Sequence, residues 1–76
     1  ERIETARFLK LFVEKVLGTN GVVSFEDRVK LENDVRALGD PQLVEQWEAF
    51  VDSQDGEEAK QKAILLMSLL TNSMIQ

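Results

Sequence analysis

The last twenty residues of the chain, positions 57–76, place the strongest constraint on what it can fold into. They begin as a charged helix and then become apolar from position 64 to position 70. On a helix with about 100° per residue, one apolar stripe holds Ala59, Ala63, Leu66, Met67, Leu70 and Met74. Leu65 and Leu69 fall outside this stripe. This helix is therefore either covered on two sides or presents a second apolar face to a partner.

The length and charge of the chain define its broad class. A chain of 76 residues forms one domain, near the lower size limit for a core that holds together unaided. Its 14 acidic and 9 basic residues give a net charge of −5, which disfavours nucleic acid and anionic membranes as partners. The apolar run is also shorter than the ~20 residues of a membrane span. Because the chain starts at Glu1 rather than Met, we expect it to be part of a longer protein. No signal-peptide pattern is visible, so the expected location is intracellular, in the cytoplasm.

Two missing residue types narrow the possible chemistry. The chain has no Cys and no His, so it lacks a thiolate nucleophile, the usual general base and the commonest transition-metal ligand. Glu45 and Glu48 form a carboxylate pair, but they lie opposite Trp47 on their helix, where we expect solvent rather than a catalytic cleft. The sequence therefore predicts a protein that is not an enzyme and has no cofactor, no metal and no small-molecule substrate.

Apolar residues at helical spacing predict four helices, at residues 3–17, 25–38 and 41–52, with the fourth beginning at Asp55 or Gly56 and continuing through the last twenty residues. In the first, the predicted buried stripe is Ala6, Leu9, Val13 and Val16, widened by Phe8, Leu11 and Phe12. In the second it is Phe25, Val29, Leu31, Val35 and Leu38. In the third it is Leu43, Val44, Trp47, Phe50 and Val51. We expect Trp47 to anchor the core, with a hydrogen-bond partner for its indole N–H.

The junction at Gly39, Asp40 and Pro41 divides the chain into two halves. Gly39 suits a helix C-terminus, Asp40 an N-cap, and Pro41 the first position of the next helix. Each half is then a helical hairpin of similar length. The predicted fold is all-α, a small antiparallel four-helix bundle built from two helical hairpins.

The loop between the first two helices allows an alternative interpretation. With Gly21 at the glycine position, residues 16–27 resemble a degenerate EF-hand loop that ends at Asp27. The first and third ligand positions are then Val16 and Gly18, which offer no side-chain oxygen. The alternative is thus a small regulatory subunit with EF-hand-like helix pairs that does not bind calcium.

The function that the sequence favours is a non-catalytic protein interaction or oligomerisation module. Its last helix would present an apolar face to a helical partner, either another protein or a second copy of the chain. The residues predicted to bind that partner are Ile64, Leu65, Leu69 and Met74. We expect Leu65 and Leu69 to face outward, although a centrally placed helix would bury both.

Overall fold

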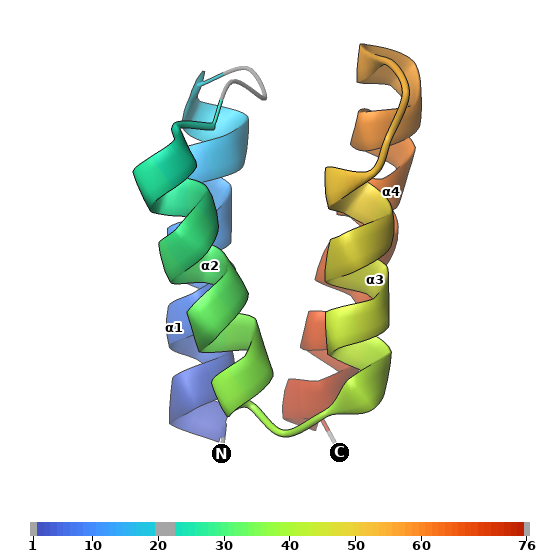
Figure 1. Cartoon of the computed structure of the whole chain (residues 1–76). Coiled ribbons are helices and arrows are strands. Elements are labelled where there is room, and N and C mark those ends of the chain that lie inside the picture. Colours follow the sequence, from blue (N-terminus) through green and yellow to red (C-terminus); the bar gives the residue numbers. More distant parts are fainter. Residues whose placement is uncertain (1, 20–22, 76) are drawn as a thin grey trace.

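Helices account for almost all of the described chain. The computed structural model describes residues 2–19 and 23–75. It contains α1 (Arg2–Val16), the short 3-10 helix η1 (Leu17–Thr19), α2 (Phe25–Ala37), α3 (Pro41–Val51) and α4 (Gly56–Ile75) (Figure 1). No strand occurs in these two ranges. The all-helical prediction is confirmed, and every predicted helix end lies within one residue of the observed one.

Side-chain caps explain where three of the helices begin. A carboxylate or hydroxyl oxygen before each helix accepts a hydrogen bond from a backbone N–H of its first turn, which has no partner inside the helix. The three bonds run from the N–H of Asp27 to Ser24 Oγ (3.1 Å), of Gln42 to Asp40 Oδ1 (3.0 Å) and of Glu58 to Asp55 Oδ1 (2.8 Å). These residues are local in sequence, which is why the helix starts are predictable from it.

Gly39 makes the sharp link between α2 and α3. Its φ is +73°, in the left-handed region that favours glycine, and a Cβ atom there would meet nothing within 4 Å. Its N–H donates to the carbonyl of Arg36 at 3.2 Å, which closes the end of α2. The predicted reversal at this glycine is confirmed, and Pro41 begins α3 directly after Asp40.

Each helix has two neighbours: α1 and α3 both lie beside α2 and beside α4. Figure 1 shows α1 and α2 together on one side, α3 and α4 on the other, and both chain ends at the same end of the molecule. The Cα radius of gyration is 11.3 Å. This matches the roughly 11 Å of a compact chain of this length.

Four aromatic side chains join α1 to α3 across the middle of the molecule. The ring of Phe12 lies 6.3 Å from Trp47 and 5.5 Å from Phe50, both edge to face, and Phe8 also meets Trp47 edge to face at 6.3 Å. Such pairs contribute about 0.5–1.5 kcal/mol each beyond the area they bury. Helices α1 and α3 do not lie side by side, so this aromatic cluster connects them across the core.

The structure corrects two of the predicted buried stripes. In α1, Ala6 is exposed and Val13 is 38% exposed, while the buried face consists of Thr5, Phe8, Phe12 and Val16. The rings of Phe8 and Phe12 point to the centre of the molecule, and this rotation of α1 leaves Ala6 and Val13 outside the core. In α2, Leu31 and Val35 are buried, but Phe25 is 75% exposed and Val29 is 42% exposed.

Candidate interaction surface

Helix α4 carries the candidate surface, and its composition changes sharply along its length. Its first turn contains Glu57 and Glu58, which suit the positive end of the helix dipole. From residue 63 to the end of the chain there is no charged side chain, although 30% of the whole chain is charged. The second half of the helix is therefore an uncharged segment on an acidic protein.

One side of α4 fixes it to the rest of the molecule. Ala63, Leu66 and Leu70 are fully buried, and Ala59, Met67 and Met74 are partly buried beside them. These six residues are the apolar stripe expected from the sequence, and all of them except Met74 belong to or pack against a core shared with α1 and α3. The docking side of α4 is thus confirmed.

The four predicted partner-binding residues differ in exposure. Ile64 is 50% exposed and Leu65 is 49% exposed, so half of each side chain is open to solvent. Leu69 is only partly exposed and packs against the core, and Met74 is also half-buried. The expectation that Leu65 and Leu69 face outward together is wrong for Leu69. On the helix it lies about 90° from the centre of the buried stripe, whereas Leu65 lies about 130° away.

The outermost residues of α4 are not among those predicted from the sequence. Ile75 is 73% exposed, and Ser68 and Thr71 are exposed on the same side of the helix. A shallow open hollow runs along this side, lined by Ile64, Met67, Ser68, Thr71 and Asn72. The spacing of positions 64, 68, 71 and 75 was a usable signal, because steps of four, three and four keep residues on one helix face.

The hydroxyl of Thr71 does not add polarity to this side. Its Oγ1 donates to the carbonyl oxygen of Met67 at 2.9 Å, one helical turn earlier. Because the hydroxyl is already bonded to the backbone, the group that Thr71 offers to a partner is its methyl group. The outer face of α4 is consequently more apolar than its sequence suggests.

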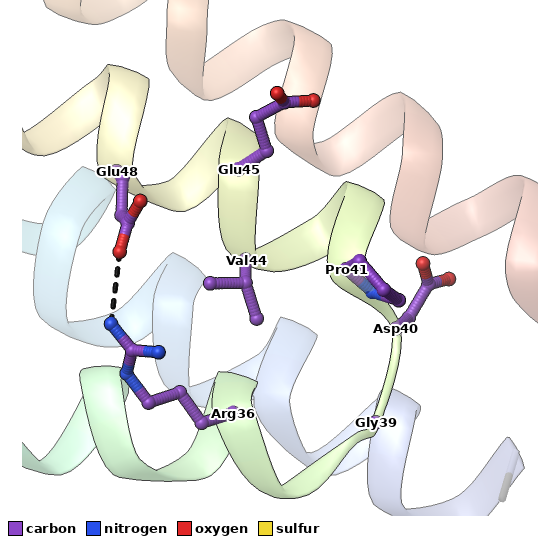
Figure 2. Close-up of a pocket in the computed structure, with 7 residues that line it drawn as sticks. All are labelled: Arg36, Gly39, Asp40, Pro41, Val44, Glu45 and Glu48. Atoms are coloured by element: carbon purple, nitrogen blue, oxygen red, sulfur yellow. Dashed lines mark hydrogen bonds and ion pairs between the residues drawn. The ribbon is translucent and has the colours of Figure 1, made fainter.

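A second hollow, at the α2–α3 link, belongs to a polar region. It is lined by Arg36, Gly39, Asp40, Pro41, Val44, Glu45 and Glu48, and Figure 2 shows the guanidinium of Arg36 directed at the carboxylate of Glu48. Their Nη2 and Oε2 atoms lie 2.9 Å apart. Glu45 is exposed, as expected for a solvated carboxylate. Glu48 is not a free carboxylate, because Arg36 binds it.

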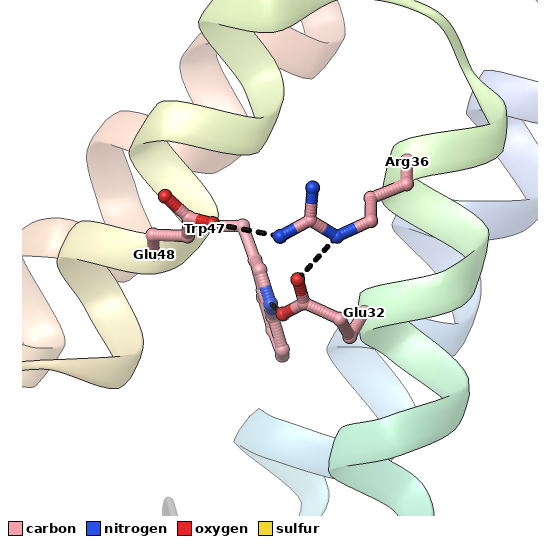
Figure 3. Close-up of polar contacts among 4 residues, drawn as sticks. All are labelled: Glu32, Arg36, Trp47 and Glu48. Atoms are coloured by element: carbon pink, nitrogen blue, oxygen red, sulfur yellow. Dashed lines mark hydrogen bonds and ion pairs between the residues drawn. The ribbon is translucent and has the colours of Figure 1, made fainter.

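The same arginine belongs to a network that joins α2 to α3 (Figure 3). The buried indole Nε1–H of Trp47 donates to Glu32 Oε1 at 2.5 Å, and Glu32 Oε2 accepts from Arg36 Nε at 2.6 Å. The expected partner of the Trp47 indole is thus Glu32. These polar contacts join the sides of α2 and α3 that face each other.

The described part of the EF-hand-like loop shows contacts other than metal ligation. Asp27, at the last ligand position, lies with its carboxylate 3.8 Å from the ammonium of Lys15, and Ser24 caps α2. Asn20, Gly21 and Val22 lie outside the described residues. Within residues 2–19 and 23–75, no group of three His, Cys, Asp or Glu residues is placed to hold a metal ion.

Comparisons of the chain with protein-family models, with curated proteins and with solved structures give no match. Among the described helices, none is long and apolar enough to cross a membrane. The residues themselves therefore carry the functional argument.

Proposed function

We propose that this chain is a non-catalytic protein interaction domain that binds a helical partner through the outer face of α4. The observation that carries the proposal is the adjacent pair Ile64 and Leu65, each about half exposed, in a segment without any charged side chain. Protein interfaces are depleted of charge at their centres, and apolar anchors on one helix face are a common mode of helix recognition.

The proposed architecture beneath this face is the antiparallel four-helix bundle of two hairpins. Two features support it: α1 and α3 each neighbour α2 and α4, and the link at Gly39 and Asp40 is short, as is typical between antiparallel neighbours. In such a bundle each helix buries one stripe and exposes the opposite one. The apolar residues on the exposed side of α4 then have no role in the core.

The energetics favour a partner for this surface. Fully burying an aliphatic side chain of this size contributes about 1.5–3 kcal/mol. In the isolated domain about half of the Ile64 and Leu65 side chains stays exposed, so a partner that covers them gains the remaining half. The polar side chains on the outer face, Ser68 and Thr71, are small, and the Thr71 hydroxyl is already bonded to the backbone, so covering them costs little. The non-catalytic part of the proposal rests on the absence of His and Cys and on the pairing of Glu48 with Arg36.

The test is a single substitution with a matched control. Leu65→Glu places a charge in the proposed face, and Val29→Glu makes the same kind of change at an apolar residue of α2 that is 42% exposed. Both variants keep the helical circular dichroism of the original chain. In affinity capture from a cell extract to which a tagged copy of the original chain has been added, the immobilised original chain and Val29→Glu retain the same protein, either a cellular protein or the tagged copy, while Leu65→Glu loses it. Equal capture by all three proteins, or by none, contradicts the proposal.

A further inference from the structure

The outer side of α4 has a symmetry that points to a particular partner. Ile64, Ser68, Thr71 and Ile75 share one helix face within about 60° and are all exposed. Along the helix these side chains are large, small, small and large. The outer pair, at positions 64 and 75, and the inner pair, at positions 68 and 71, share one midpoint, between positions 69 and 70. The stripe therefore reads the same in both directions along the helix.

From this we infer that a second copy of the chain binds here, with the two α4 helices packed antiparallel around a two-fold axis. This inference deepens the proposed function and rests on it. A two-fold interface brings the same patch of both copies together, so the patch must complement itself. When the midpoints coincide, Ile64 is level with Ile75 of the second copy, and Ser68 is level with its Thr71.

The sizes of the side chains fit a crossing of two helices. Two packed helices are closest at the crossing point and diverge toward both ends. Ser68 and Thr71 are small and border the hollow at the centre of the stripe, so they let the backbones approach. Ile64 and Ile75 lie about 17 Å apart along the axis and fill the space where the helices diverge.

Charge also makes the outer face of α4 a better contact for a second copy than the exposed apolar residues of α2. Each copy carries a net charge of −5, so contact between two copies is opposed least where the touching surfaces themselves carry no charge. Residues 63–76 meet that condition. The exposed Phe25 and Val29 on α2 do not, because Glu26, Arg28 and Lys30 are interleaved with them.

The size of the contact sets the strength that we expect. One helix on one helix buries less than the ~800 Å² per partner of a standard stable interface. Dimerisation should consequently be weak and depend on concentration. The mass in solution should rise from the 8.6 kDa of one chain toward twice that value between about 10 μM and about 1 mM protein.

The first test compares two variants that add the same charge. Ser68→Arg brings two guanidinium groups together at the crossing point, whereas Asn33→Arg adds one to the exposed surface of α2. By sedimentation equilibrium, Asn33→Arg dimerises like the original chain and Ser68→Arg stays monomeric at every concentration. Circular dichroism of both variants shows the helicity of the original. A dimer that survives Ser68→Arg overturns the inference.

The second test measures the register, and it uses the absence of cysteine from the chain. Ile64→Cys and Ile75→Cys, oxidised separately, form few disulfides. In each case the cysteine of one copy lies about 17 Å along the axis from the same cysteine of the second copy. An equal mixture of the two forms the mixed disulfide. Efficient cross-linking of Ile64→Cys with itself indicates a parallel pairing and overturns the inference.

The outcomes also separate this inference from the proposed function. If the chain is monomeric at all concentrations and Leu65→Glu still loses a captured protein, the partner is a different chain and only the second copy is excluded. If the chain is monomeric and capture does not differ between Leu65→Glu and Val29→Glu, both proposals are wrong.

Discussion

At the scale of single residues, Leu65 and Leu69 show how a small rotation on a helix separates two roles. Both precede a buried leucine of α4, and their sequence surroundings are similar. Leu69 packs against the core, while Leu65 is 49% exposed. The difference follows from their angular distance to the buried stripe, and it assigns Leu69 to stability and Leu65 to the proposed interaction.

This assignment predicts opposite results for the same substitution. Leu69→Glu places a charge against the core and loses part of the leucine burial, so the free energy of unfolding should fall by about 1–3 kcal/mol. Leu65→Glu should cost less than Leu69→Glu, at most about 1 kcal/mol, because about half of the Leu65 side chain is already open to solvent. Urea denaturation followed by circular dichroism measures both. Equal destabilisation by the two variants contradicts the assignment.

At the scale of helices, a polar network connects α2 to α3. Glu32 is the central residue, because its two carboxylate oxygens accept from Trp47 Nε1 and from Arg36 Nε. Arg36 in turn reaches Glu48 on α3. Trp47 is fully buried while Glu32 is in place, so its indole N–H is satisfied by Glu32 rather than by water.

We therefore predict that Glu32 and Glu48 contribute unequally to stability. Glu32→Ala leaves the buried indole N–H without a partner and should lower the free energy of unfolding by about 1–3 kcal/mol. Glu48→Ala removes only an exposed ion pair, with an expected cost of about 0–1 kcal/mol. Glu32→Gln keeps an oxygen acceptor and should recover part of the loss. If Glu32→Ala is no worse than Glu48→Ala, the hydrogen bond to Trp47 does not contribute as described.

At the scale of the whole molecule, the aromatic cluster makes the two halves of the chain depend on each other. Phe8 and Phe12 come from α1, and Trp47 and Phe50 from α3. Their edge-to-face contacts cross the centre, where neither half has an apolar core of its own. The four helices should consequently unfold together rather than as two independent hairpins.

A substitution in α1 should thus be detected by the single tryptophan in α3. Phe12→Leu removes the ring that contacts both Trp47 and Phe50, and we expect a loss of about 1–2 kcal/mol in the free energy of unfolding. Trp47 fluorescence and circular dichroism should give coincident unfolding curves, shifted by the same amount. Two separate transitions, with only the dichroism curve shifted, indicate independent hairpins instead.

The sequence by itself determined the helices, their ends and the docking side of α4. These features depend on residues close together in the chain: Ser24, Asp40 and Asp55 cap the following turn, and Gly39 adopts a conformation that few other residues tolerate. Local chemistry of this kind acts in the same way whatever the rest of the protein does. The prediction of a candidate surface on α4 rests on the same kind of local pattern.

Only the tertiary structure decided which apolar residues are buried and which stay exposed. Val13, Phe25 and Val29 have the spacing of core residues, yet they lie outside the core, and Leu69 does the reverse of what was expected. Burial depends on how far each helix is rotated toward its neighbours. That rotation follows from contacts distant in sequence, above all the rings of Phe8 and Phe12 against Trp47 and the pairing of Trp47 with Glu32.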